Sequence, residues 1–109
     1  MMETKVEKLG SGWTVLSVVG RVDGHTAPEL ETVCRAQVAA GAIKLALDIT
    51  AVTFMSSAGL RVLLATRKSL ASKAGEMAVV GAQPNVRQVL DISGFTAILR
   101  LESSRAALV

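Results

Sequence analysis

Hydrophobic residues change their spacing repeatedly along this chain, between the two-residue period of a strand and the longer period of a helix, and this alternation limits its possible folds most. Helix-like spacing covers residues 26–40, 57–74 and a segment that opens at 83–85 and stops at Gly94, whereas strand-like runs cover 4–9, 13–20, 43–49, 77–80 and 98–101. The tail from Glu102 is expected to be helical or frayed. The order predicts an α/β domain whose mixed sheet of about five strands packs with three to four helices.

Turn and cap residues indicate where these elements begin and end. The segment 10–12 is a short Gly-rich turn between the first two strands, and residues 13–20 are apolar on both faces, which predicts an interior strand. Thr26 and Glu29 have capping-box spacing, with the Thr26 hydroxyl expected to accept from the Glu29 amide. Gly41 and Gly75 are expected to close the first two helices.

Length and composition favour one domain, residues 1–109. Half of the residues are hydrophobic but only 3% are aromatic, so the core must be built from Val, Leu, Ile and Ala. Cys34, the single cysteine, permits neither an internal disulfide nor a cysteine metal cage, and we expect it to be a small core residue. We expect no metal and no cofactor.

The sequence also argues against membrane and nucleic-acid partners. It contains no apolar stretch of the roughly 20 residues that a bilayer-spanning helix needs, and its first residues lack the apolar run of a signal peptide. We therefore expect a cytoplasmic protein without membrane insertion. The net charge of +3 is mild and the basic residues are scattered without aromatic neighbours, which disfavours nucleic-acid binding.

The sequence contains the residue types of a catalytic triad but not the motif that usually presents them. Ser57, His25 and Asp23 formally supply a nucleophile, a base and an orienting carboxylate. However, the chain has no Gly-x-Ser-x-Gly elbow and little material for a substrate pocket, so we expect no catalytic residues and no enzyme. Asp48, in the third strand-like run, is expected to be solvated or a turn acceptor.

Residues 47–60 read Leu-Asp-Ile-Thr-Ala-Val-Thr-Phe-Met-Ser-Ser-Ala-Gly-Leu. This segment is similar to the core motif of the STAS domain family, which in anti-sigma factor antagonists has an apolar residue and Asp before Val-x-Phe-Met-Asp-Ser-Ser-Gly-Leu. The resemblance extends in order, without large gaps, over nearly the whole chain. Residues 20–30 resemble the family's Gly-x-Leu-Asp and the Thr-Ala helix start that follows. Residues 80–81, 86–90 and 93–95 fit the later pattern.

The resemblance implies a partner switch. In the family, the unphosphorylated antagonist binds an anti-sigma factor that is also a serine kinase, and so releases the sigma factor; the kinase phosphorylates a serine and a serine phosphatase reverses this. By position that serine is Ser57, with Ser56 the less favoured choice. Two residues depart from the motif, since Ser56 replaces its acid and Ala58 its second serine. From the resemblance and the residues together, we expect a partner-binding surface made of Asp23, His25, Thr26, Ser56, Ser57, Ala58, Gly59 and Arg61.

The residues themselves agree with this reading of the turn at 56–59. Ser57 stands where a helix N-cap is expected, and the free amides there would hold a phosphate without disrupting the helix. Gly59 would leave the first turn open to a partner's backbone, and Arg61 is the nearest charge able to steer an acidic partner. The simpler reading is that Ser56 and Ser57 only cap the helix.

A second function stays open because Ser56 replaces the family's acid. STAS domains also serve as non-phosphorylated subunits of stressosome-like assemblies or of lipid-transport complexes associated with ABC transporters. The sequence leaves the oligomeric state open.

Overall fold

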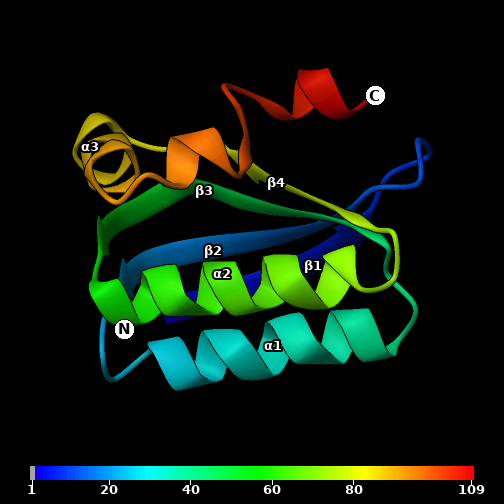
Figure 1. The fold of residues 1–109 in the computed structure, drawn as a ribbon, viewed down its shortest axis with the longest axis horizontal. Coiled ribbons are helices and arrows are strands. Elements are labelled where there is room, and N and C mark those ends of the chain that lie inside the picture. Colours follow the sequence, from blue (N-terminus) through cyan, green and yellow to red (C-terminus); the bar gives the residue numbers. More distant parts are fainter. Residues whose placement is uncertain (1) are drawn as a thin grey trace.

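A computed structural model describes residues 2–109 (Figure 1). The strands are β1 (Met2–Lys8), β2 (Thr14–Val22), β3 (Lys44–Met55), β4 (Glu76–Val80) and β5 (Arg100–Glu102). The α-helices are α1 (Ala27–Ala39), α2 (Ser57–Ala71) and α3 (Pro84–Ile92), and two short 3-10 helices are η1 (Phe95–Ala97) and η2 (Arg105–Leu108). The predicted order is confirmed, and the tail after Glu102 does contain a helical turn.

The five strands form one mixed sheet in the order β1-β2-β3-β4-β5. β1 and β2 flank the predicted turn at 10–12 and pair antiparallel as a hairpin, whereas β2 to β5 are parallel. Parallel neighbours need crossover connections, and α1, α2 and α3 supply them in turn. The interior position predicted for β2 is also confirmed, because it pairs with β1 on one side and β3 on the other.

The main core lies between the sheet and its helices. α1 and α2 run side by side along one face of the sheet (Figure 1). Leu30 of α1 and Leu63 of α2 are almost completely buried, as are Leu47 of β3 and Val79 of β4. The core is aliphatic as predicted, and fully burying each such side chain is worth about 1.5–3 kcal/mol.

A smaller cluster lies on the other face of the sheet. There Leu108 of η2 is 3% exposed and packs with Trp13, Val15, Ala46 and Val80. This second layer explains why residues 13–20 are apolar on both faces, since Val15 lies under the C-terminal segment while Leu16 belongs to the main core.

Several element limits differ from the sequence prediction. β3 does not end near Ile49 but continues to Met55, and Ile43 lies outside it with 53% of its surface exposed. α2 ends at Ala71 instead of Ala74. The left-handed residue after α2 is Ala74, with φ 56°, and not Gly75.

The two glycines expected as helix caps have different roles. Gly41 has φ 101° and closes α1 as predicted, a conformation that glycine adopts without steric cost. The amide of Gly75 donates to the Leu70 carbonyl at 2.7 Å, but its Cα lies against the Ile43 carbonyl, where a Cβ would clash. A close approach between loops, rather than backbone conformation, therefore accounts for glycine at position 75.

The extended course of β3 brings two turns to one end of the molecule. Val22 at the end of β2 pairs with Met55 at the end of β3, and the amide of Ser56 donates to the Val22 carbonyl at 2.8 Å. α1 and α2 each begin within a few residues of these positions. The turn at residues 23–26 and the turn at 56–59 are therefore neighbours.

Candidate functional site

Ser56 and Ser57 have separate structural roles. Ser56 is extended (φ −90°, ψ 173°) and is the N-cap of α2, where its Oγ accepts from the Gly59 amide at 3.4 Å. Ser57 is the first helical residue, and its side chain is exposed. The expectation that Ser57 is the N-cap is therefore wrong by one residue, because the backbone stays extended for one residue after β3 ends at Met55.

Gly59 faces the interior and not a partner. It is buried, and a Cβ placed on it would lie 2.7 Å from Val22 Cγ1 and closer still to Met55 Sδ. Ala58 is half-buried against the core. The expectation that Gly59 leaves the first turn open to a partner's backbone is wrong, since its missing side chain lets α2 approach β2. At 56–59, Ser57 is the exposed residue.

The turn before α1 is organised by Asp23. Its Oδ1 accepts from the amides of His25 at 2.9 Å and Thr26 at 3.1 Å. The Thr26 backbone is already helical, and its hydroxyl donates to the Arg21 carbonyl and accepts from the Asp23 amide, both at 2.9 Å. The predicted capping box with Glu29 is therefore wrong, because the Thr26 hydroxyl bonds within the turn and Asp23 accepts from the Thr26 amide that Glu29 would have bound. The amides of Thr26 and His25, with Thr26 first, hold the pKa of Asp23 below its usual value.

The structure does not assemble the formal catalytic set. The Asp23 carboxylate binds backbone amides rather than the His25 imidazole, and His25 is exposed. In residues 2–109 no hydrogen bond joins the side chains of Ser57, His25 and Asp23. The same residues contain no group of three or more His, Cys, Asp or Glu side chains placed to hold a metal ion.

A cation–π pair borders the turn at residues 56–59. The sequence analysis did not predict this pair. Arg21 of β2 stands opposite Phe54 of β3, with its guanidinium carbon 4.4 Å from the ring centroid. Phe54 keeps 38% of its surface exposed. Arg61, one turn into α2, is also exposed. The site is therefore a polar end face with a partly exposed aromatic ring, and only the register between β2 and β3 reveals the pair.

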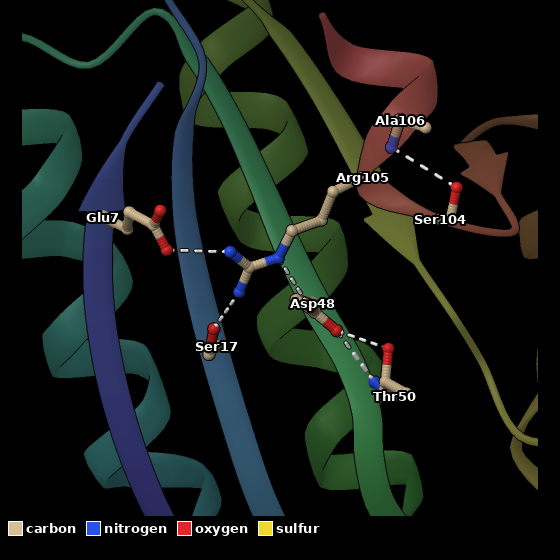
Figure 2. A network of polar contacts seen from close by, with 7 residues as sticks. All are labelled: Glu7, Ser17, Asp48, Thr50, Ser104, Arg105 and Ala106. Carbon is tan, nitrogen blue, oxygen red and sulfur yellow. Dashed lines mark hydrogen bonds and ion pairs between the residues drawn. The ribbon is translucent and has the colours of Figure 1, made fainter. Parts of the chain in front are cut away.

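A second polar cluster lies on the sheet face that η2 covers (Figure 2). Arg105 donates from Nε to Asp48 Oδ2 at 2.7 Å, from Nη1 to Glu7 Oε1 at 2.8 Å and from Nη2 to Ser17 Oγ at 2.6 Å. Asp48 also accepts from the amide and hydroxyl of Thr50. Asp48 is thus an acceptor, as predicted, but Arg105 was not foreseen as its partner.

The surroundings of Asp48 act on its pKa in opposite directions. Partial burial raises the pKa, while the bonds from the Thr50 hydroxyl, Arg105 and the Thr50 amide lower it and prevail.

Burial raises the pKa of the Cys34 thiol to about 11. Cys34 is 2% exposed, which confirms it as a small core residue. No helix within residues 2–109 has the length and apolar character needed to cross a bilayer.

These features define a class: a small α/β domain with a mixed sheet, whose polar end presents an exposed serine in the first turn of a helix. The chain belongs to the STAS domain family, whose model matches residues 4–108.

Relatives within this family agree with the assignment. The chain is 36% identical over 106 residues to BtrV of Bordetella bronchiseptica, named "Putative anti-sigma factor antagonist", across 97% of this chain and 90% of that protein. It is 33% identical to an anti-sigma factor antagonist from Mycobacterium paratuberculosis, whose crystal structure superposes with a TM-score of 0.90 over 99% of this chain and 91% of that one.

A more distant structure shares the fold alone. The Bacillus cell fate determinant SpoIIAA, solved in its phosphorylated form, has a TM-score of 0.75 at 20% identity, over 97% of this chain and 96% of that one. The predicted STAS fold is thereby confirmed.

Proposed function

We propose that this chain is a partner-switching antagonist in the cytoplasm that regulates by binding and is not an enzyme. Without phosphate on Ser57 it binds an anti-sigma factor of the serine-kinase type, and the sigma factor is released. The kinase then transfers the γ-phosphoryl group of ATP to Ser57 Oγ, which loses its proton, and ADP departs. The phosphorylated chain binds the kinase weakly until a serine phosphatase hydrolyses the ester.

The observation that carries this proposal is the division of roles between the two serines. Ser56 uses its hydroxyl as the cap of α2, whereas Ser57 is exposed one residue later. A kinase therefore reaches the Ser57 hydroxyl without breaking the cap, which also favours Ser57 over Ser56. A phosphate there lies at the positive end of the helix dipole, so it changes the surface while the fold persists.

The neighbouring turn supplies the rest of the partner surface. Asp23, His25 and Thr26 lie at the same end as Ser57 because β2 and β3 end side by side. Arg61 adds an exposed cation. The names of the relatives, which are anti-sigma factor antagonists, support an anti-sigma factor as the partner of this surface.

Ser56 supports a second candidate. The family motif has an acid at this position, and a kinase or phosphatase that reads this acid would bind the present chain less well. In that case the domain serves as a non-phosphorylated STAS subunit of a stressosome-like or lipid-transport complex.

Titration calorimetry with a kinase-type anti-sigma factor from the same organism tests the proposal. We expect Ser57→Ala to bind like the wild type and Ser57→Asp to bind at least tenfold more weakly, since an uncompensated interfacial charge typically costs a few kcal/mol and about 1.4 kcal/mol is tenfold. Ser11→Asp, on the hairpin turn, adds the same charge away from the site and should bind normally. Equal affinity of Ser57→Ala and Ser57→Asp, or no transfer of phosphate to Ser57 by mass spectrometry, would favour the second candidate.

A further inference from the structure

Arg61 differs from most other arginines of the chain. Arg67 donates to the Ile98 carbonyl at 2.8 Å, while Arg100 and Arg105 bind carboxylates at 2.7 Å. The guanidinium of Arg61 makes no hydrogen bond or ion pair within residues 2–109. It is an exposed cation one helical turn after Ser57.

The other two α-helices already contain ion pairs at this spacing. On α1, Arg35 lies 3.6 Å from Glu31, and on α3, Arg87 lies 3.2 Å from Asp91, each four residues apart. On α2, the position four residues before Arg61 is held by Ser57 and the position three before by Ala58. Neither is charged, so α2 lacks the acidic half of such a pair until Ser57 is modified.

Helix geometry favours contact between these two side chains. Side chains on an α-helix lean toward its N-terminus, so Arg61 extends over the turn that contains Ser57. Residues four apart lie about 5–6 Å from each other at Cβ, within reach of a guanidinium. An arginine fork also matches the oxygens of a phosphate, to which it donates two hydrogen bonds.

We propose that Arg61 is the internal counter-ion of phosphorylated Ser57, an inference that rests on Ser57 being the modified residue. Without phosphate, Arg61 is available to an acidic group of the partner. With phosphate, Arg61 binds its oxygens and is withdrawn from that surface. Phosphorylation therefore changes the partner surface twice, by adding an anion and by occupying a cation.

The neighbouring charged groups are already engaged. The Asp23 carboxylate accepts from two backbone amides, and Arg21 is stacked on Phe54. Arg61 is also closer to Ser57 along α2 than either Arg67 or Lys68. Among the residues described on α2, Arg61 is the cation placed to meet a phosphate at Ser57.

Phosphorus NMR on the full chain tests this pairing without any kinase. Phosphoserine is introduced at position 57 by genetic encoding, and the second pKa of the phosphate, about 6 when unperturbed, is titrated in three backgrounds. A paired guanidinium favours the dianion, so the pKa should be lower in the otherwise wild-type chain than in Arg61→Gln. Lys68→Gln, an exposed cation two turns further along α2, should titrate like the wild type.

Two results would overturn the pairing. One is the same phosphate pKa in the otherwise wild-type chain and in Arg61→Gln. The other is a rise of the phosphate pKa in Lys68→Gln equal to that in Arg61→Gln, which would show that any positive charge on α2 has the same effect. Because the phosphoserine is encoded, a kinase that fails to modify Ser57 contradicts the proposed function and leaves this measurement unaffected.

Discussion

The Nε of Arg105 lies 2.7 Å from Oδ2 of Asp48, although the two residues are 57 positions apart in the sequence. The side chain of Asp48 is 14% exposed and that of Arg105 is 35% exposed, so this pair is more sheltered than an ordinary surface ion pair. Through it, η2 is tied to β3, and through Glu7 and Ser17 the same guanidinium reaches β1 and β2 (Figure 2).

Loss of this guanidinium should lower stability measurably. We expect Arg105→Ala to reduce the free energy of unfolding by about 1–2 kcal/mol, because three charge-assisted bonds to partly exposed groups are lost. For a domain of this size that corresponds to roughly 4–8 °C of Tm per kcal/mol in thermal melting. Arg35→Ala removes the exposed pair with Glu31 and should cost about 0.5 kcal/mol or less. Equal losses in the two variants would contradict a special role for Arg105.

The lowered pKa of Asp48 predicts part of the acid sensitivity. Its folded pKa lies below its unfolded value of about 3.9. The stability it contributes is therefore fully present above that value and is lost as the pH falls through the folded pKa. We expect the Tm of the wild type to fall more steeply between about pH 5 and 2 than that of Asp48→Asn. Asp23, whose pKa is also lowered, should preserve some slope in the variant, whereas parallel curves would exclude a contribution from Asp48.

Gly59 should tolerate no added methyl group. A Cβ there meets Val22 Cγ1 and Met55 Sδ, and Val22 is stiff because it is branched at Cβ. We expect Gly59→Ala to lower the free energy of unfolding in urea by about 1–3 kcal/mol, the usual range for overpacking. At Gly24 a Cβ meets nothing within 4 Å, so Gly24→Ala should change stability by about 0.5 kcal/mol at most. If Gly59→Ala were as stable as the wild type, α2 would have shifted away from Val22 and Met55 at no cost in free energy.

Replacing Ser56 and replacing Ser57 should change the free energy of unfolding by different amounts. Ser56→Ala removes the cap and should cost about 0.5–1 kcal/mol, the lower part of the usual range because the bond to Gly59 is long at 3.4 Å. Ser56→Asp keeps an acceptor and adds a negative charge at the helix start, worth about 0.3–1 kcal/mol. Ser57→Ala should unfold in urea like the wild type. If Ser57→Ala lost more unfolding free energy than Ser56→Ala, Ser57 and not Ser56 would be the cap of α2.

Local patterns predicted most of the fold because strand and helix spacings and turn residues are short-range signals. The segment around residues 47–60 was sufficient to place Ser57 at the start of a helix. The link between Arg105 and Asp48 was not predictable, since nothing near either residue indicates a contact across 57 positions. The hairpin of β1 and β2, by contrast, was predictable from the residues of its own turn.

The errors at the site have a common physical cause. Whether Gly59 faces inward depends on the rotation of α2 against β2, which tertiary packing sets. The Thr26 to Glu29 spacing fits a capping box, but the Thr26 hydroxyl bonds the Asp23 amide and the Arg21 carbonyl instead. Asp23 in turn accepts from the Thr26 amide, which the Glu29 side chain would bind in a capping box. A sequence pattern alone does not choose between these partners.

The antiparallel pairing of β1 has a practical consequence for anyone who labels or fuses this domain. Met2 pairs with Gly20, close to the end of β2, so β1 starts at the same end of the sheet as the serine turn. An affinity tag or fluorescent protein joined ahead of Met2 would emerge at the end of the sheet where Ser57 lies and would restrict access to that end. The hairpin turn at residues 10–12 lies at the opposite end of β1 and is exposed, which makes it the better place for a probe.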